Sequence, residues 1–508
     1  MNLRTEVLII GEGATGVGIA RDLALRGVPS VLIEKGDFAS GASGRNHGLL
    51  HSGARYAVSD PEAAKECFTE NRVLRKIAPH CIEATDGLFV SLPEDGLAYR
   101  DQFLRACEKA AIPTTLCSRG EALELEPGLN PELLSAVRIP DGAIDPFTLI
   151  VENAKDAEEG GAKILLYTEP TSLILERNRV KGVKAKDRIN GEEHLIEASF
   201  LMNATGSWAN DLLKLAGLHV AMALSKGTML VTNQRVSQRV INRCRKPSDG
   251  DIIVPNEAVS ILGTTSVRSE EVENFEVTPS EVSLLIEEGS KMIPGIKGNR
   301  FIRAYAGVRP LVQPEEMADD RAISRGFTLI DHGKRDGLEN LITITGGKLM
   351  TYRLMAERAS DLICQKMGVH VSCSTHLQPL PGANQPSGLK ERLKSLGQRS
   401  QKRGEILCDC ELVERKEVER LLKEEKIRTP QDILHRTRLA KGTCQGGFCI
   451  YRFLGMLHDL KMGGPDSNAI LKSFLEERWR GIRPVLWGGA VKEEELIESI
   501  YKGIFNLS

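Results

Sequence analysis

Hydrophobic and polar residues near the start of the chain follow the pattern of a parallel α/β unit. Residues 7–10 are four consecutive apolar residues, which is typical of a buried strand, and a glycine-rich turn follows at residues 11–16. Residues 17–25 have the pattern of a helix, and residues 31–34 have that of a second short strand. The start of the chain is therefore predicted to form a strand–helix–strand unit.

Beyond this unit, the pattern predicts a long α/β body followed by a segment of different character. Apolar runs at residues 164–167 and 341–345 predict strands between polar helices. A connector rich in Pro and Gly follows around residues 379–388, and residues 390–430 are then dense in Lys, Arg and Glu.

The C-terminal part has the signals of a small helical module. Val418, Leu421 and Leu422 have helical spacing, and the Thr-Pro-Gln-Asp sequence at residues 429–432 is typical of a helix start. The predicted organisation has four segments: a body (1–380), a linker (381–400), a helical module (401–455) and a C-terminal extension (456–508).

Composition and charge narrow the class of protein. Of 508 residues, 41% are hydrophobic and 27% are charged, as in a soluble globular protein. The formal charge of −2 gives no basic field, so nucleic acid is not an expected partner. No apolar run reaches the roughly 18 residues of a spanning helix, and the N-terminus has no signal-peptide pattern. The protein is therefore expected in the cytoplasm, with its 11 cysteines as thiols or metal ligands.

The glycines of the first turn have the spacing of a dinucleotide-binding fingerprint. Gly11 permits a tight turn, Gly13 the close approach of a pyrophosphate, and Gly16 the close packing of helix and strand. Glu34, with Lys35 beside it, ends the next strand and is suited to bind the adenosine ribose. The helix N-terminus faces the phosphate charge. The sequence therefore predicts a bound dinucleotide, although glycine-rich turns also occur for structural reasons alone.

Two later segments favour FAD over NAD. Residues 201–206 are a strand that ends in a small-residue turn, and residues 342–348 are a strand that runs into paired glycines. Strands of this kind, far along the chain from the first glycine turn, suit a long cofactor whose isoalloxazine end is bound by the C-terminal half of the body. Each segment is also compatible with an ordinary strand-to-helix turn.

The candidate substrate-binding residues are mostly cationic. Residues 45–56 contain two histidines and two arginines, and a second cationic set consists of Arg303, Arg309 and Arg325. Lys348 follows the paired glycines. Several arginines that converge on a flavin site would suit a small phosphate dianion, which Arg binds in a bidentate manner. A single Arg is more often a surface charge or the partner of a carboxylate.

The same stretch offers a base. Oxidation of a secondary alcohol requires a hydride acceptor and a group that takes the hydroxyl proton. Histidine suits that role near neutral pH, and His51 is favoured over His47. The alternative is a core histidine held by one hydrogen bond.

Four cysteines in the helical module form two close pairs. One residue separates Cys408 from Cys410, and four residues separate Cys444 from Cys449. Four thiolates on adjacent loops suit a [2Fe–2S] cluster or a tetrahedral Zn²⁺. Zinc sites usually have C-x₂₋₄-C spacings, so an iron–sulfur electron relay is favoured over zinc and over incidental thiols. The other seven cysteines have no ligand spacing and are expected to be packing residues.

Taken together, these motifs resemble those of FAD-dependent glycerol-3-phosphate dehydrogenases. With its C-terminal cysteine module, the chain is similar to the large catalytic subunits of the anaerobic enzymes. The resemblance extends over nearly the whole chain and is carried by six segments: 11–16, 45–56, 242–249, 303–310, 346–353 and 477–481.

The resemblance implies an α/β fold in which a Rossmann-like FAD-binding domain is interleaved with a D-amino-acid-oxidase-like mixed-sheet substrate domain. It also implies a helical [2Fe–2S] module similar to bacterioferritin-associated ferredoxin. The implied reaction is oxidation of sn-glycerol 3-phosphate to dihydroxyacetone phosphate, with electrons passed through the iron–sulfur relay to the quinone pool in anaerobic respiration. The implied partners are a second, smaller flavoprotein and an iron–sulfur subunit that docks the complex to the inner face of the cell membrane.

The resemblance also assigns residues. Arg55, Arg309, Arg325 and Lys348 would hold the phosphate and the reacting oxygen. The residues expected to bind or border FAD are Gly11, Gly13, Gly16, Glu34, Lys35, Ser43, Arg45, Asn46, His47, Gly48, Leu49, Ala204, Gly206, Gly346, Gly347, Lys348, Leu349 and Met350.

The chain departs from the family pattern at two places. Related single-subunit enzymes often have His where this chain has Met229, which places the role of base on His51. The second cysteine pair is C-x₄-C, whereas the usual ferredoxin-type spacing closes with C-x₂-C.

Other interpretations concern the substrate and the partners. The alternative enzyme is a flavin dehydrogenase for a 2-hydroxy acid or an amino acid, and a different class is a non-catalytic electron-transfer or iron-delivery scaffold. The segment around Trp479, Arg480 and Trp487 is expected either to contact a partner or membrane surface or to pack back on the body.

Overall fold

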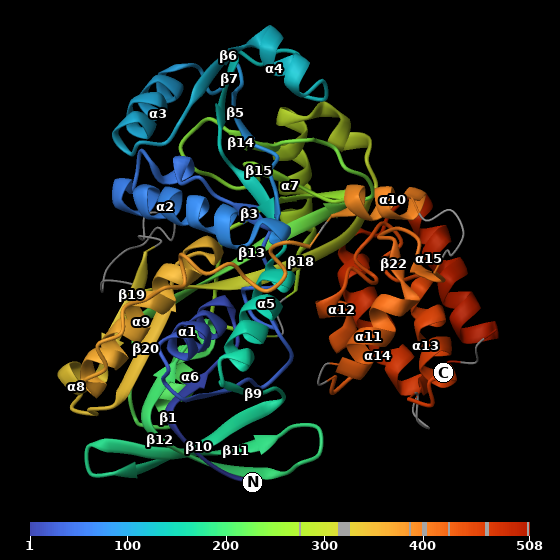
Figure 1. The fold of residues 1–508 in the computed structure, drawn as a ribbon. Helices are drawn as coiled ribbons and strands as arrows, with labels where there is room; N and C mark the ends of the chain where they lie inside the picture. The colour runs from blue at the N-terminus through green and yellow to red at the C-terminus, as the bar shows by residue number, and fades with distance from the viewer. Residues whose placement is uncertain are drawn as a thin grey trace.

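The computed structural model describes most of the chain, and the described residues are 1–273, 276–312, 326–385, 388–398, 404–424, 427–462, 467–504 and 507. Figure 1 shows three parts: an α/β part that contains the N-terminus, a second part above it, and a helical part at the C-terminal end. Arg325, one of the predicted substrate-binding residues, lies outside the described residues.

The predicted strand–helix–strand unit is confirmed, and it forms the centre of the first sheet. β1 (Asn2–Ile10) pairs in parallel with β2 (Ser30–Ile33) and with β12 (Glu193–Asn203). The sheet continues in parallel through β9 (Lys163–Leu165) beside β2 and β20 (Leu341–Gly346) beside β12. The predicted strand at residues 341–345 is therefore confirmed, whereas the one at residues 164–167 is confirmed only as far as Leu165, because residues 166–167 form a turn.

Antiparallel strands extend this sheet on the side of β12 that faces away from β1, and β9 forms the other edge, to give eight strands within the described part of the chain. β10 (Thr168–Glu176) and β11 (Arg179–Asp187) follow one another beside β12, and β19 (Phe327–Asp331) pairs with β20. The carboxyl ends of the parallel strands all lie at one edge of the sheet, which is where ligands bind in open α/β sheets.

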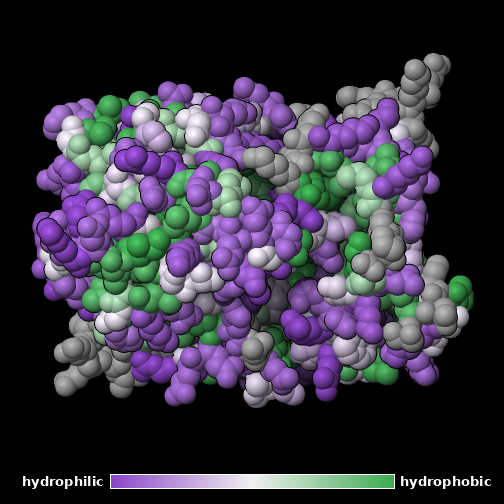
Figure 2. All heavy atoms as spheres, turned by 90° about the horizontal axis from the view of Figure 1, so that it is seen from below, coloured by the Kyte–Doolittle hydropathy of each residue, from purple (hydrophilic) through white to green (hydrophobic). Residues whose placement is uncertain are grey.

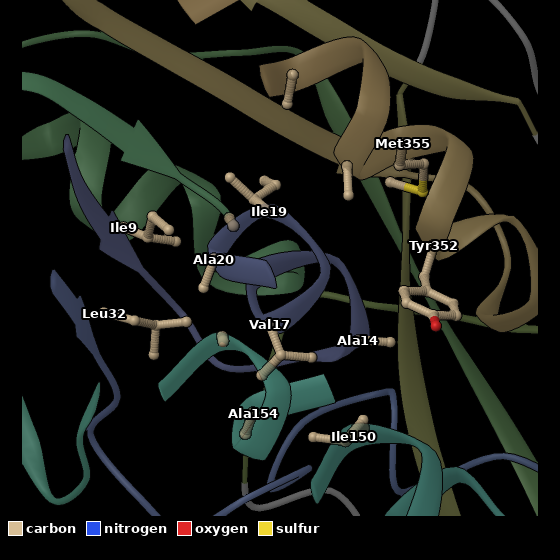
Figure 3. Close-up of a cluster of buried hydrophobic side chains, with 14 of the residues drawn as sticks. Ile9, Ala14, Val17, Ile19, Ala20, Leu32, Ile150, Ala154, Tyr352 and Met355 are labelled. Atoms are coloured by element: carbon tan, nitrogen blue, oxygen red, sulfur yellow. The ribbon is translucent and has the colours of Figure 1, made fainter. Parts of the chain in front are cut away.

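A buried hydrophobic cluster holds α1 (Ala14–Leu25) against the sheet. The helix begins three residues earlier than predicted, because Gly13 already serves as its N-cap. Figure 3 shows Val17 of α1 near Ile150 and Ala154 of α5 (Pro146–Glu159), and Tyr352 and Met355 of α9 (Tyr352–Met367) beside α1. Each large apolar side chain buried in this way contributes about 1.5–3 kcal/mol.

The second large sheet is mostly antiparallel. Its longest pair is β13 (Met222–Thr232) and β18 (Phe301–Val312), whose register runs from Met222 opposite Val312 to Thr232 opposite Phe301. The other strands are β5 (Gly87–Ser91), β6 (Thr115–Ser118), β7 (Ser135–Ile139), β14 (Val240–Arg243), β15 (Ile252–Asn256), β16 (Val259–Gly263) and β17 (Val267–Ser269).

Helices and a small sheet complete the body. The short strands β3 (Leu49–Leu50) and β4 (Ile82–Glu83) both pair with β8 (Gly142–Ile144), which anchors the segment that follows the first α/β unit. The remaining body helices are α2 (Pro61–Ile77), α3 (Ala98–Lys109), α4 (Arg119–Leu125), α6 (Ala209–Lys214), α7 (Pro279–Met292) and α8 (His332–Arg335).

The C-terminal part forms one helical module. Its elements are α10 (Leu389–Gln398), β21 (Ile406–Cys408), β22 (Val413–Glu414), α11 (Arg415–Glu424), α12 (Asp432–Arg436), α13 (Cys449–Asp459), α14 (Ser467–Ile482) and α15 (Gly489–Ser499). The predicted helix around Val418 is confirmed as α11. α12 begins later than the sequence signal at Thr429, because the Thr429 hydroxyl donates to the Asp432 carboxylate at 2.6 Å in a turn before the helix.

The module differs from the predicted segments in two respects. The predicted boundary between residues 455 and 456 falls inside α13, and Val418, Phe453 and Tyr501 belong to the same buried core. The apolar side chains of the predicted extension thus pack on the module rather than forming a separate unit. In the predicted linker, residues 389–398 form α10.

No helix in the described ranges combines the length and the apolar character that crossing a membrane requires. On the face seen in Figure 2, hydrophilic side chains surround separate hydrophobic patches.

Candidate active site

A cavity of about 960 Å³ is lined by residues of both large sheets. The predicted residues that line it are Gly11, Gly13, Glu34, Lys35, Ser43, Arg45, Asn46, His47, Leu49, His51, Arg55, Ala204, Gly206, Arg309, Gly346, Gly347, Lys348, Leu349 and Met350. Gly16 and Gly48, also predicted, are not among its lining residues.

The glycine turn after β1 is too crowded for side chains. Gly11 has a φ of +103°, and a Cβ atom there would lie 2.7 Å from the carbonyl oxygen of Ala204. A Cβ atom at Gly16 would lie 1.9 Å from the carbonyl oxygen of Gly11. The two glycines therefore let the turn and the start of α1 close on each other, which leaves backbone N–H groups at the cavity edge.

Glu34 and Ser43 are fixed beside this turn by backbone groups. The carboxylate of Glu34 accepts hydrogen bonds from the N–H groups of Glu12 and Gly36, both at 2.9 Å. The Ser43 hydroxyl accepts one from the N–H of Ala14 at 3.0 Å. The helix N-terminus and an oriented carboxylate thus lie at one end of the cavity.

The segment 45–56 brings His51 and Tyr56 into the cavity. The ring centroid of His51 lies 5.5 Å from that of Tyr56 and 6.2 Å from that of His47. The backbone here is held by the Asn71 side chain, which donates to the His51 carbonyl at 3.0 Å. Asp141 holds the next residue, because its carboxylate accepts from the N–H of Ser52 at 2.7 Å.

Tyr56 is a cavity residue to which the sequence pattern assigned no role. The ammonium nitrogen of Lys348 lies 4.5 Å from the centre of its ring, in a cation–π contact. Tyr56 therefore contacts both His51 and Lys348, and the sequence signal for it is its place at the end of the 45–56 segment.

Arg309 lies on β18 and reaches across β13. Its Nη2 donates to the Thr264 hydroxyl and to the carbonyl oxygen of Thr265, both at 2.8 Å. Both acceptors are uncharged. Arg303, from the same predicted cationic set, instead pairs with Glu477 of α14 at 3.0 Å and does not line the cavity.

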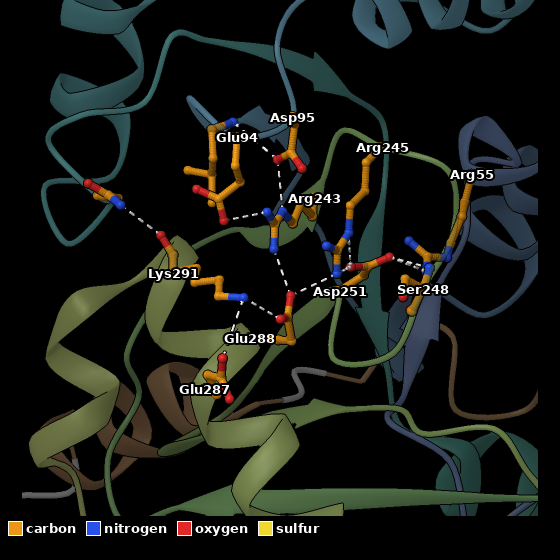
Figure 4. Close-up of polar contacts among 12 residues, drawn as sticks. Arg55, Glu94, Asp95, Arg243, Arg245, Ser248, Asp251, Glu287, Glu288 and Lys291 are labelled. Atoms are coloured by element: carbon orange, nitrogen blue, oxygen red, sulfur yellow. Dashed lines mark hydrogen bonds and ion pairs between the residues drawn. The ribbon is translucent and has the colours of Figure 1, made fainter.

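Arg55 is already paired with a buried carboxylate. Its Nη2 donates to Asp251 at 3.1 Å, and the other oxygen of Asp251 accepts from Arg245 at 2.8 Å. Figure 4 shows the chain of contacts continuing from Arg245 through Glu288 to Arg243. Arg55 therefore occupies a fixed position at the cavity wall.

The four predicted ligand cysteines lie together in the helical module. The thiol of Cys408 has Cys410 and Cys449 as neighbours, and each of these two is also a neighbour of Cys444. Among the residues that the structure describes, no group of three or more His, Cys, Asp or Glu side chains is arranged to hold a metal ion. The four thiols are thus neighbours in a ring without a preformed single-ion site.

The helical module is bound to the loop that follows Glu34. Asp37 accepts a hydrogen bond from His435 at 2.6 Å and pairs with Arg436 at 3.1 Å. Burial opposes ionisation of Asp37, but the His435 hydrogen bond and the Arg436 charge outweigh it and lower the Asp37 pKa. The ring of Phe38 lies beneath the Arg436 guanidinium at 4.5 Å.

Phe147 of α5 contacts both the cavity loop and the module. A Cβ atom at Gly44 would lie 3.1 Å from its ring. On the module side, His435 stacks on Phe147 with centroids 5.2 Å apart, and the Lys441 ammonium lies 4.1 Å from the ring centre. One aromatic side chain thus joins the segment next to Ser43 to the loop that precedes Cys444.

Comparisons with known proteins agree on one family. A family model described as FAD dependent oxidoreductase matches residues 6–362. The chain is 45% identical over 530 residues to the A subunit of the anaerobic glycerol-3-phosphate dehydrogenase of Haemophilus influenzae, a match that covers 100% of this chain and 94% of the relative. The protein of the same name from Escherichia coli K12 is 44% identical over 527 residues, with 99% and 97% covered.

A solved structure supports the fold. The glycerol-3-phosphate dehydrogenase from Bacillus halodurans, complexed with FAD, matches with a TM-score of 0.66 and 23% identity, covering 96% of each chain. At this identity the likeness concerns the fold alone.

Proposed function

The chain belongs to the FAD-dependent oxidoreductases, within the family formed by the A subunits of anaerobic glycerol-3-phosphate dehydrogenases, and on this basis we propose that it oxidises sn-glycerol 3-phosphate to dihydroxyacetone phosphate. The observation that carries the proposal is that His51, Arg309 and Lys348 line the same cavity as the dinucleotide turn.

The cavity fits FAD at the end formed by the first sheet. Gly13 and the N-terminus of α1 would face the pyrophosphate, and Glu34 would bind the adenosine ribose. Segments 43–49 and 346–350 would border the flavin. When bound, FAD supplies the hydride acceptor that the protein's own side chains lack.

The protein's side chains would bind and orient the substrate. Arg309 and Lys348 are cations beside the paired-glycine turn, suited to hold the reacting oxygen and the negative charge that develops on it. Tyr56 orients Lys348 through the cation–π contact. His51 would accept the hydroxyl proton, in keeping with its position beside Tyr56.

The four cysteines would hold a [2Fe–2S] cluster that relays electrons away from the flavin. Four neighbouring thiols match the donor set of such a cluster, in which each iron takes two thiolates. The contacts of Phe147 with the cavity loop and with the module support a relay, because they fix the module next to the cofactor-binding loop.

The final acceptor and the partners complete the proposal. Electrons would pass to the quinone pool through a complex with a second, smaller flavoprotein and a membrane-docking iron–sulfur subunit, so that the protein is attached to the membrane through its partners. Phe448, next to Cys449, is 67% exposed, and Trp479 and Trp487 are 41% and 47% exposed. These side chains would suit contact with a partner.

Anaerobic absorbance of the purified holoprotein tests the reaction. Addition of sn-glycerol 3-phosphate is expected to bleach the flavin band, whereas glycerol and lactate are expected to leave it unchanged. Bleaching by lactate or an amino acid instead would favour the alternative substrate class, and bleaching by none of these compounds would refute the proposal.

A further inference from the structure

A short cationic loop of the second sheet lines the cavity and has no part in the proposal above. Residues 244–251 connect β14 to β15, and Lys246, Pro247 and Ser248 line the same cavity as His51 and Lys348. We infer that this loop binds the phosphate group of the substrate, with Lys246 and Ser248 as direct ligands. The inference rests on the proposed function and assigns one end of its substrate.

The loop is held in one conformation by buried ion pairs. Asp251, which is fully buried, accepts from the N–H of Ser248 at 2.6 Å, so that the loop closes on its own carboxylate. Arg243, at the start of the loop, pairs with Glu94, Asp95 and Glu288. Figure 4 shows the contacts of Arg243 and those of Asp251. Binding of a ligand there would therefore cost little conformational entropy, because the loop is already ordered.

Of the two basic residues in the loop, Arg245 and Lys246, only Arg245 has an acidic partner among the residues that the structure describes. Arg55 and Arg245 share the carboxylate of Asp251, and Arg243 has three acidic partners. Within the described ranges, Lys246 makes no ion pair and no hydrogen bond, and the Ser248 hydroxyl makes none either. An exposed ammonium group without an acidic partner and a hydroxyl group two residues further along the same cavity-lining loop are suitable ligands for phosphate oxygens.

The position of the loop suits the end of the substrate that is not oxidised. Lys348 follows the Gly346–Gly347 turn of the first sheet, at the end where the flavin is expected. The loop comes from the second sheet and is linked to the Arg309 site through Thr264, whose carbonyl oxygen accepts from the N–H of Gly250 at 3.3 Å. Thr264 also binds Arg309 through its hydroxyl. A small substrate that spans from Arg309 to Lys246 would therefore place its alcohol carbon and its phosphate at opposite ends.

Two matched lysine substitutions test this inference. Lys246→Gln removes the charge at the loop, and Lys181→Gln removes the same charge from β11, where Lys181 pairs with Glu176 at the surface. Both variants are to be purified with FAD. Their flavin content, the KM and kcat for sn-glycerol 3-phosphate, and the Kd of inorganic phosphate are then compared with those of the wild type.

Lys246→Gln is expected to raise the KM roughly 10- to 100-fold, with little change in kcat, and to weaken the binding of inorganic phosphate by a similar factor. Lys181→Gln is expected to match the wild type. Equal KM and Kd values in the two variants would overturn the inference.

The measurements separate this inference from the proposed function. If sn-glycerol 3-phosphate does not reduce the wild-type flavin, the proposed function fails. The effect of Lys246→Gln on phosphate affinity, followed by the change in flavin absorbance or by calorimetry, still decides whether the loop binds a phosphate group. A phosphate affinity that does not depend on Lys246 would refute the loop as the site even in an active enzyme.

Discussion

The guanidinium group of Arg309 occupies the space that a side chain at Gly227 would fill. A Cβ atom at Gly227 would lie 1.9 Å from Nη2 of Arg309 and 2.9 Å from its Cζ. The two residues lie on the neighbouring strands β13 and β18. The same nitrogen donates to Thr264 and Thr265. The absence of a side chain at Gly227 and these two oxygen acceptors together fix the position of the guanidinium group.

This relationship predicts the effect of one methyl group. Gly227→Ala is expected to displace Arg309 and to lower kcat/KM for sn-glycerol 3-phosphate roughly 100-fold, because a misplaced binding group loses its contribution to catalysis. Flavin content is expected to stay the same. Gly120→Ala, where a Cβ atom meets nothing within 4 Å, serves as the control. Equal activity of the two variants would argue against a role for Arg309.

The two cavity histidines are expected to respond differently to substitution. His51→Asn is expected to lower kcat by about 10²- to 10⁴-fold, since this is the usual contribution of a positioned base. The acidic limb of the pH–rate profile is expected to disappear at the same time. His47→Asn, the neighbouring substitution, is expected to keep that limb. Loss of the limb in His47→Asn alone would transfer the role of base to His47.

The ligand assignment of the cysteines is tested by metal content. Cys444→Ala is expected to remove the iron, the acid-labile sulfide and the visible cluster absorbance, while sn-glycerol 3-phosphate still reduces the flavin. Cys373→Ala, which changes a cysteine outside the ring of four, is expected to retain the cluster. Iron retained in Cys444→Ala would refute the assignment. Zinc instead of iron in the wild type would show that the four cysteines form a structural metal site and not an electron relay.

Asp141 links the stability of the body to pH. Burial raises the pKa of Asp141 to about 6 from its ordinary value of 3.8, although hydrogen bonds from Ser52 and Asn242 act in the opposite direction. Between these two values the unfolded chain ionises before the folded protein does. The contribution of this carboxyl group to stability is therefore present at low pH and falls as the pH rises toward 6.

Substitution by the neutral amide is expected to remove this dependence. Between about pH 5 and about pH 8, the wild type is expected to lose on the order of 1 kcal/mol of unfolding free energy relative to Asp141→Asn, because the amide does not ionise. Chemical denaturation at the two pH values measures it. Asp101→Asn, at an exposed position, is the control. A difference that does not change with pH would contradict the raised pKa.

Features that depend on neighbouring residues were predictable from the sequence. The apolar runs around Ile9 and Ile342 indicated the strands, and the spacing of Gly11, Gly13 and Gly16 indicated the turn, since strands and turns are specified locally. The helical spacing around Val418 indicated α11 in the same way.

Features that depend on distant partners were not predictable. Arg303 pairs with Glu477, which is 174 residues away, and Arg55 pairs with Asp251, which is 196 residues away. Sequence alone did not show which partners each of these arginines has, nor that Nη2 of Arg309 donates to Thr264 and Thr265. The sequence also did not single out Lys246 as a substrate-binding residue. The ion pairs of the neighbouring basic residues, which set Lys246 apart, involve residues that are distant in the sequence.

The salt bridge between Asp37 and Arg436 has a consequence for the biogenesis of the protein. Arg436 is synthesised almost 400 residues after Asp37, which lies only three residues beyond Glu34. The parallel pairing of β12 with β20 likewise completes the first sheet only when residue 346 has been made. A nascent chain on the ribosome thus presents an open cofactor-binding edge until its last third emerges. Capture of FAD is therefore expected only after β20 has been synthesised, and docking of the helical module only after Arg436 has been.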